Sequence, residues 1–258
     1  MSAITIPWLE PNQPFPPVSM ALPNGLLAAG ADLSVPRLLD AYSQGLFPWF
    51  NAGEPILWWS PNPRAVLQCD QFKLSKSLAK KCRQIARQEF DSTNNQRIKI
   101  TTNCAFLQVI SQCSSTRQHQ EGTWISSEII EAYYHLHLYQ QAHSIEVWRG
   151  EELVGGLYGV QLGQFFFGES MFSLITDASK IALYYLTLYL KKQLKITHID
   201  CQQETPHLIS LGATSINRAD FIELVNKKAH LEKQMWGRGQ LSATGDLHRF
   251  EDSFNAHA

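Results

Sequence analysis

Cysteine is scarce in this sequence, and its placement does not suggest cross-links. The chain has five scattered cysteines: Cys69, Cys82, Cys104, Cys113 and Cys201. An odd number without any CxxC pair is typical of reduced intracellular thiols rather than of a disulfide framework or a structural zinc site. His135 and His137 offer no metal site either, because residues two apart point to different faces of a helix. We therefore predict a cytoplasmic protein without disulfides or bound metal.

Long apolar runs and a large net charge are also missing. No segment reaches about 18 uninterrupted apolar residues, the length that suggests a membrane-spanning helix. The first residues, MSAITIPWLEPNQPFPP, contain no basic stretch and are interrupted by prolines, so we predict neither a signal peptide nor a membrane anchor. The formal net charge of -1 argues against a uniformly basic nucleic-acid binder, although a local basic patch can still attract phosphates.

The composition that remains, 44% hydrophobic and 17% charged, is that of a globular protein. Residues 1–62 are rich in proline, glycine and tryptophan and contain one clear helix signal, DLSVPRLLDAYSQG. There Ser34 can cap the helix, Pro36 fits its first turn and Gly45 can end it. We predict a small N-terminal domain over residues 1–62, a larger domain over 63–240 and a C-terminal extension over 241–258.

Helices and strands alternate in the larger domain. The patterns predict a strand at RIKIT, a helix at NCAFLQVISQCSS with Asn103 as its cap, a helix at SSEIIEAYYHLHLYQQAH, strands at HSIEVWRG, ELVGGLYGVQLG and QFFFGESMFS, a helix at DASKIALYYLTLYLKKQL, a strand at THIDCQ and a helix at HLISLGA. Antiparallel strands followed by a helix and a further strand indicate an α/β (α+β) fold, a mixed sheet flanked by helices. This order resembles the acyltransferase fold of GCN5-related N-acetyltransferases and Fem-type aminoacyltransferases.

One basic stripe stands out against the neutral total. The segment from Phe72 to Arg87 has a helical pattern, and its cations recur at three- and four-residue spacing, so that they share one face. The stripe consists of Lys73, Lys76, Lys80, Arg83 and Arg87, with Lys81 beside it. No acidic residue lies between Lys73 and Arg87 to neutralise it. By default, such a stripe is a solvated helix face.

The strand THIDCQ carries the polar residues that are hardest to explain as core. Period-two alternation sends Asp200 and Gln202 to one face of the strand and Cys201 to the other. Cys201 is therefore a poor candidate for a nucleophile. From these residues alone, Asp200 and Gln202 would be interpreted as a polar strand end in solvent.

Nine ordered motifs change that interpretation. They are PNGLLAAGADLS, AYSQGLFPWF, PILWWSPNPRAVL, EGTWIS, HSIEVW, LVGGLYGV, GESMFS, IDCQ and SLGA, running from about Pro23 to Ala213. Together they resemble the leucyl/phenylalanyl-tRNA–protein transferase family. The resemblance implies an acyltransferase domain with a small N-terminal domain, leucyl-tRNA or phenylalanyl-tRNA as donor, and acceptor proteins that begin with arginine or lysine and are thereby marked for degradation. It implies no cofactor, and it leaves the polar segment at 91–96 and the C-terminal extension without a role.

The resemblance also implies a reaction centre at Asp200 and Gln202. An amide is not basic, so we expect Gln202 to position the incoming amine through hydrogen bonds, with Asp200 orienting Gln202. A strong base is not required, because an α-amino group has a pKa of ~7.7 to 8.0 and orientation alone can supply ~7 to 11 kcal/mol. Glu169, in GESMFS, either makes structural hydrogen bonds or attracts the cationic amine.

The remaining expected contacts follow from the resemblance as well. An apolar pocket for the transferred side chain is implied at Phe166, Gly168, Met171, Leu183 and Ile199, although ordinary core is the alternative for each. Trp49 and Trp124, with Tyr42 as a third candidate, would stack on the aminoacyl-adenosine or else serve as packing anchors. One methylene changes binding in such a pocket by only ~1 to 3 kcal/mol, so we predict that methionine is accepted more weakly. With tRNA implied, tRNA docking becomes the better interpretation of the basic stripe.

Three alternatives remain open. An acetyl-CoA-dependent N-acetyltransferase would need a glycine-containing loop for pyrophosphate, whereas MFSLITDASK contains no glycine and carries Asp177. A Fem-like transferase would use the same donor and add amino acids to a cell-wall precursor. A non-catalytic RNA-binding module would need only the basic helix and exposed aromatic residues.

Overall fold

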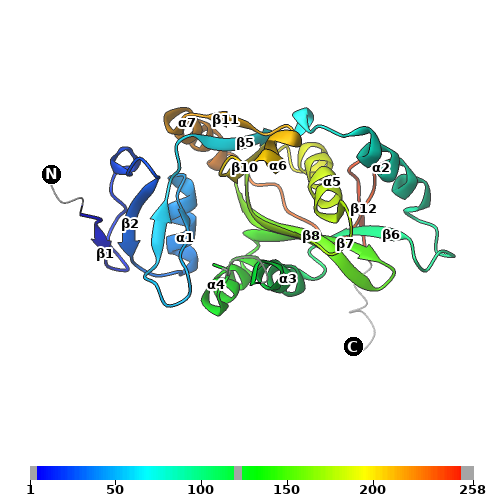
Figure 1. Ribbon diagram of the computed structural model, residues 1–258, viewed down its shortest axis with the longest axis horizontal. Coiled ribbons are helices and arrows are strands. Elements are labelled where there is room, and N and C mark those ends of the chain that lie inside the picture. The colour runs from blue at the N-terminus through cyan, green and yellow to red at the C-terminus, as the bar shows by residue number, and fades with distance from the viewer. Residues whose placement is uncertain (1–4, 119–123, 251–258) are drawn as a thin grey trace.

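The computed structural model describes residues 5–118 and 124–250, arranged in two sheets (Figure 1). The first sheet contains β1 (Trp8–Leu9), β2 (Leu26–Gly30), β3 (Phe47–Pro48) and β4 (Leu57–Trp59) in the order β1-β2-β4-β3. With helix α1 (Val35–Ser43) and the short 3-10 helix η1 (Val18–Met20), it forms an N-terminal unit at one end of the molecule. The chain then enters the second sheet at Arg64.

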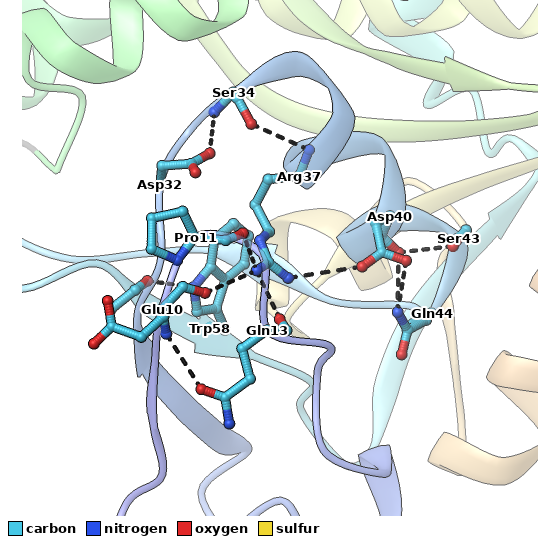
Figure 2. Close-up of polar contacts among 11 residues, drawn as sticks. Glu10, Pro11, Gln13, Asp32, Ser34, Arg37, Asp40, Ser43, Gln44 and Trp58 are labelled. Carbon is cyan, nitrogen blue, oxygen red and sulfur yellow. Dashed lines mark hydrogen bonds and ion pairs between the residues drawn. The ribbon is translucent and has the colours of Figure 1, made fainter.

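Helix α1 begins and ends as its sequence predicts. The Ser34 hydroxyl accepts a hydrogen bond from the Arg37 backbone N–H, Pro36 lies in the first turn, and Gly45 follows with a φ of 73°. Figure 2 shows that the Arg37 guanidinium then reaches back to the N-terminal segment, where it donates to the carbonyl oxygens of Glu10, Pro11 and Gln13. This buried cation therefore ties the first residues to α1.

The second sheet has nine strands in the order β11-β5-β10-β9-β8-β7-β6-β12-β13. These are β5 (Arg64–Gln68), β6 (Ile98–Thr102), β7 (Ala142–Arg149), β8 (Glu152–Leu162), β9 (Phe165–Ser173), β10 (His198–Gln202), β11 (Thr214–Ile216), β12 (Gly239–Leu241) and β13 (Leu247–Arg249). Within the described ranges, β9–β10 is the one parallel pair of this sheet. The mixed α/β fold predicted from the sequence is confirmed.

Helices cover both faces of the second sheet (Figure 1). Helices α3 (Phe106–Gln118) and α4 (Ser127–Leu138) pack on one face, while α5 (Ala178–Gln193) and α2 (Lys76–Gln88) lie on the other. The remaining helices are η2 (Cys69–Gln71), α6 (Pro206–Ser210) and α7 (Arg218–Ala229). In the described part of the chain, no helix is both long enough and apolar enough to cross a bilayer.

Each face of the sheet has its own buried core. The core on the α3–α4 side is continuous with the N-terminal unit, because Leu38, Tyr42 and Trp58 belong to the same cluster as Tyr133 and Phe167. The core on the α5 side contains the apolar face of α2 and the residues of β8, β9 and β10 that point to it. The N-terminal unit is thus joined to the larger unit by a shared hydrophobic interior.

The start of α3 differs from the prediction. Asn103 does not cap this helix: its φ is 55°, and its side-chain oxygen accepts from the Ser144 backbone N–H at 3.1 Å. The Glu146 carboxylate on β7 instead accepts from the backbone N–H groups of Cys104 and Ala105, at 3.2 and 3.3 Å. A buried carboxyl group from a neighbouring strand therefore satisfies donors that precede the helix.

Two other boundaries also differ from the sequence prediction. Helix α2 begins at Lys76 rather than near Phe72, because the Ser75 hydroxyl caps it by accepting from the Leu78 backbone N–H. The expected domain end at residue 240 falls inside β12, which pairs with β6 on one side and β13 on the other. Residues 241–249 therefore continue the large sheet, and 251–258 lie outside the described residues, as do residues 121–123 of EGTWIS.

Candidate active site

The site lies where the parallel strands β9 and β10 separate. They pair at Ile199 with Phe166 and at Asp200 with Phe167, and not beyond. Gly168 lies at this point, and a Cβ there would stand 3.2 Å from the Asp200 carbonyl oxygen, so the missing side chain permits close approach. Next to it, Glu169 is an extra residue in β9 relative to β8, and Cys201 is an extra residue in β10 relative to β5. Such bulges redirect side chains and are common beside active sites.

A cavity of about 240 Å³ opens at this separation. Its apolar wall comes from β8, β9, α5, β10 and α6: Leu157, Phe166, Met171, Leu183, Leu186, Ile199 and Leu208. The N-terminal unit contributes Phe47, Pro48 and Trp49, and Trp124 precedes α4. Polar groups converge at one side, namely Glu169, Ser170, Asp200 and Gln202. An apolar hollow with a few convergent polar groups is the usual form of a small-molecule binding site.

Glu169 is buried and surrounded by neutral donors. Its carboxylate accepts from the Tyr42 hydroxyl at 2.7 Å, from the Tyr133 hydroxyl at 3.1 Å and from the Gln202 side-chain amide at 3.2 Å. Burial raises the pKa of Glu169 to about 7, and the hydrogen bonds from the two tyrosines partly oppose that rise. Near neutral pH this carboxyl group is therefore able to take up or release a proton.

Asp200 is buried beside a cation. Arg64 on β5 donates to both carboxylate oxygens, at 2.8 Å from Nε and 2.6 Å from Nη2, and both side chains are fully enclosed. The same carboxylate accepts from the Gln202 backbone N–H at 2.8 Å. Gln202 has a φ of 61°, a backbone conformation that costs free energy for a non-glycine residue. Asp200 therefore holds Gln202 through the backbone, while Glu169 holds the side chain.

Alternation along β10 is as the sequence predicts despite the bulge. Asp200 and Gln202 meet Arg64 and Glu169 on one side of the sheet, while Cys201 packs against the core on the other side. Burial raises the pKa of the Cys201 thiol far above its ordinary value, so the reactive thiolate is disfavoured.

The structure brings nearly all the expected site residues to this cavity. Its lining includes the residues expected for catalysis and for the side-chain pocket, and both tryptophans: Asp200, Gln202, Glu169, Phe166, Gly168, Met171, Leu183, Ile199, Trp49 and Trp124. Tyr42 differs, because its ring is fully buried and its hydroxyl bonds to Glu169 and Tyr133. It cannot stack on a base, and it supports Glu169 instead.

Sequence reasoning did not single out several residues of the site. Arg64 lies within a motif that carries the family resemblance, and a carboxylate on a buried strand needs a cation, so a signal for it existed. Tyr133 carried no such signal, because nothing in the spacing of α4 connects it with Glu169. Among the described residues, no group of histidines, cysteines and carboxylates is arranged to hold a metal ion.

The basic stripe largely keeps its predicted form. Lys76, Lys80, Arg83 and Arg87 are exposed at helical spacing on α2, and Lys73 is exposed just before the helix. Lys81 departs from the prediction, because it forms an ion pair with Asp177 at 2.8 Å, from a distant part of the chain. Its charge is thus partly neutralised.

Comparisons with known proteins agree on one family. Residues 66–226 match the model of the leucyl/phenylalanyl-tRNA protein transferase, and residues 31–62 match the model of its N-terminal domain. The leucyl/phenylalanyl-tRNA–protein transferase of Bordetella petrii is 50% identical over 94% of this chain and 96% of its own length. That of Nitrosomonas eutropha is 52% identical over 84% and 88%.

A solved structure, L-PGS from Bacillus licheniformis, aligns over 67% of this chain and 51% of its own with 14% identity and a TM-score of 0.35, too low to bear on fold or site. The two family models together cover more than half of the chain, and the Bordetella petrii relative is aligned almost from end to end. The chain therefore belongs to the leucyl/phenylalanyl-tRNA–protein transferase family of aminoacyltransferases.

Proposed function

We propose that this enzyme moves leucine or phenylalanine, and methionine more weakly, from its tRNA to the N-terminal arginine or lysine of acceptor proteins. A peptide bond forms, and the product is marked for degradation in the cytoplasm. The observation that carries this proposal is the cavity, which is apolar along one wall and reaches Glu169, Asp200 and Gln202 at one side. Such a cavity can hold an aliphatic or aromatic side chain while the ester carbon of the amino acid remains beside the polar groups.

The donor end of the tRNA is proposed to bind across both units. The apolar wall receives the amino-acid side chain, and Trp49 and Trp124, which also line the cavity, are placed to stack on the terminal adenosine. Trp49 belongs to the N-terminal unit and is 38% exposed. Its backbone carbonyl oxygen accepts a hydrogen bond from the Trp59 indole N–H at 2.7 Å. The N-terminal unit therefore contributes directly to substrate binding in this proposal.

The acceptor amine is proposed to bind at Gln202. The Gln202 side-chain N–H donates to Glu169, which leaves the amide oxygen to accept from the incoming amine. Glu169 lies behind it with a pKa raised to about 7 by burial, so its partial negative charge favours a cationic group nearby. Orientation of an already reactive amine, rather than a strong base, then accelerates the reaction.

We propose that no cofactor takes part. For a coenzyme-A-dependent reaction, the start of α5 would have to accept a pyrophosphate, but Asp177 occupies that place with a carboxylate paired to Lys81 and Lys180. This carboxylate already occupies both neighbouring lysines, and MFSLITDASK has no glycine to let a phosphate approach the backbone, which disfavours this alternative.

The test mixes purified protein with radiolabelled leucyl-tRNA and a peptide that begins with arginine. We expect labelled peptide, comparable transfer from phenylalanyl-tRNA, weaker transfer from methionyl-tRNA, and no transfer to a peptide that begins with glutamate. A lipid-linked cell-wall precursor should not compete. No transfer from any charged tRNA, or competition by the precursor, would overturn the proposal.

Variants extend the same assay to the reaction centre. Gln202→Ala and Asp200→Ala are expected to lose most of the activity. Gln164→Ala, in the turn before β9 and outside the cavity lining, is the matched control and should keep it. Full turnover by Gln202→Ala would remove its proposed role.

A further inference from the structure

A second hollow, here called the α5–α6 hollow, is formed by the start of α2, the start of α5 and the end of α6. Its volume is about 240 Å³. Leu78 and Leu211 give it a buried apolar floor. The polar residues that line it are all exposed or half-buried, so their side chains are open to solvent: Lys73, Ser75, Lys180 and Ser210. Among the described residues that line this hollow, none is acidic.

Positive charge at the α5–α6 hollow exceeds the negative charge beside it. Lys180 and Lys81 share the single carboxylate of Asp177, at 3.0 and 2.8 Å, so one of their two charges stays uncompensated. Within residues 5–118 and 124–250, Lys73 forms no ion pair. An ammonium group has three N–H donors, and the bond to Asp177 uses one of those on Lys180. The hollow can therefore accept an anion.

The α5–α6 hollow and the cavity at Glu169 are built from the same two helices. Helix α5 contributes Leu183 to the cavity and Lys180, one turn earlier, to the hollow, while α6 contributes Leu208 to the cavity and Ser210 to the hollow. Along the long axis of the molecule, α6 and α5 lie between the N-terminal unit and α2 (Figure 1). An RNA strand with its last nucleoside at the N-terminal unit and its helical part on α2 must therefore cross this region.

We propose that the α5–α6 hollow binds a backbone phosphate of the single-stranded 3′ end of the donor tRNA, with Lys180 and Lys73 as its cations. This inference rests on the proposed function. Phosphate contacts position a strand without reading its sequence, so the hollow sets how far the 3′ end enters the cavity for either donor tRNA. The contact differs from a coenzyme-A site, because lysine side chains meet the phosphate and the backbone at the start of α5 does not.

The test uses two analogues that carry leucine in a stable amide bond on adenosine. One is the nucleoside alone, which has no phosphate, and the other is the trinucleotide CCA with its internucleotide phosphates. Titration calorimetry measures the affinity of the full-length protein for each. We expect Lys73→Ala/Lys180→Ala to bind the trinucleotide about 10-fold more weakly and the nucleoside as the wild type does. The slope of log affinity against log salt for the trinucleotide should fall by roughly 0.7, the value for one phosphate on a single strand.

Two further variants control for charge and for folding. Lys180→Arg keeps the cation and should bind the trinucleotide as the wild type does. Lys191→Ala/Lys195→Ala removes two exposed lysines near the other end of α5 and should bind both analogues normally.

Three outcomes would overturn the assignment of the α5–α6 hollow. They are wild-type affinity of Lys73→Ala/Lys180→Ala for the trinucleotide, an equal loss for both analogues in that variant, and a 10-fold loss in Lys180→Arg. Wild-type protein that neither binds the nucleoside analogue nor transfers leucine would instead contradict the proposed function, so the two failures are distinguishable.

Discussion

At the cavity, Asp200 and Glu169 are both buried but have different partners. Asp200 faces the Arg64 guanidinium, which compensates its negative charge. Glu169 faces two tyrosine hydroxyls and an amide, which stabilise a carboxylate less than a cation does, so burial dominates and its pKa rises to about 7. Of these two carboxyl groups, Glu169 is the one whose burial among neutral partners makes it an exchangeable proton site near neutral pH.

The raised pKa of Glu169 predicts a definite dependence of stability on pH. The folded carboxyl group binds its proton up to about pH 7, whereas in the unfolded chain it loses the proton near the model value of 4.5. The stabilising effect of protonation is therefore complete below about 4.5 and is lost as pH rises to 7. Glu169→Gln is always neutral, so the difference in unfolding free energy, wild type minus variant, should fall across this window and level off above it.

Urea denaturation at a series of pH values measures this difference. Glu151→Gln, which changes an exposed carboxylate between β7 and β8, controls for the substitution itself. Parallel curves for wild type and Glu169→Gln between pH 4.5 and 7 would contradict the raised pKa.

At the scale of elements, the exposed face of α2 carries a row of cations that suits a polyanion. Lys76, Lys80 and Arg83 lie on consecutive turns, while Asp177 neutralises Lys81 from the side. Each phosphate contact contributes roughly 0.9 to the slope of log affinity against log salt. The double variant Lys76→Ala/Lys80→Ala should therefore weaken tRNA binding and lower that slope by roughly 1.8.

The salt titration of tRNA affinity needs a control of equal charge. Lys191→Ala/Lys195→Ala removes two exposed lysines at the end of α5 and just beyond it, outside the stripe. It should change the slope much less than the α2 variant does. Equal slopes for the two double variants would mean that the α2 face does not bind phosphates.

Elements also show where sequence reasoning succeeds and fails. Apolar periodicity predicts α4, α5 and β7 to β10 well, because each buries one face or a continuous run within the core. It fails at the start of α3, where the carboxylate of Glu146, more than 40 positions from the residues it binds, replaces the expected Asn103 cap. A contact between distant positions leaves no local pattern in the sequence.

The site itself was predicted through the family motifs rather than through periodicity. Phe166, Met171 and Ile199 are ordinary apolar strand residues by their pattern, yet they line the cavity. The bulge at Glu169 could not be predicted, because an extra residue in one strand is defined only by its pairing with the next. Tyr42 was misplaced for a related reason, since an aromatic residue on α1 can face a ligand or the interior equally well.

At the scale of the whole molecule, the two units share one core. Leu38 and Trp58 from the N-terminal unit lie in the same buried cluster as Tyr133 and Phe167 from the larger unit. Tyr42 adds a polar link, because it bonds to Glu169 across the same contact. Trp49 completes the cavity from the N-terminal side. The cavity is thus complete only while the two units are packed together.

We therefore expect the units to unfold in one cooperative transition. Leu38→Ala leaves a cavity in the shared core and should lower the unfolding free energy by about 2 to 5 kcal/mol. Hydrogen exchange of peptides from β2 to β4 and from β7 to β9 would report the two units separately, and both should lose protection equally. Leu190→Ala, on the opposite face of the large sheet, serves as the control and should also affect both. If Leu38→Ala reduces hydrogen-exchange protection in β2 to β4 alone, the N-terminal unit opens independently. The shared core then does not couple the unfolding of the two units.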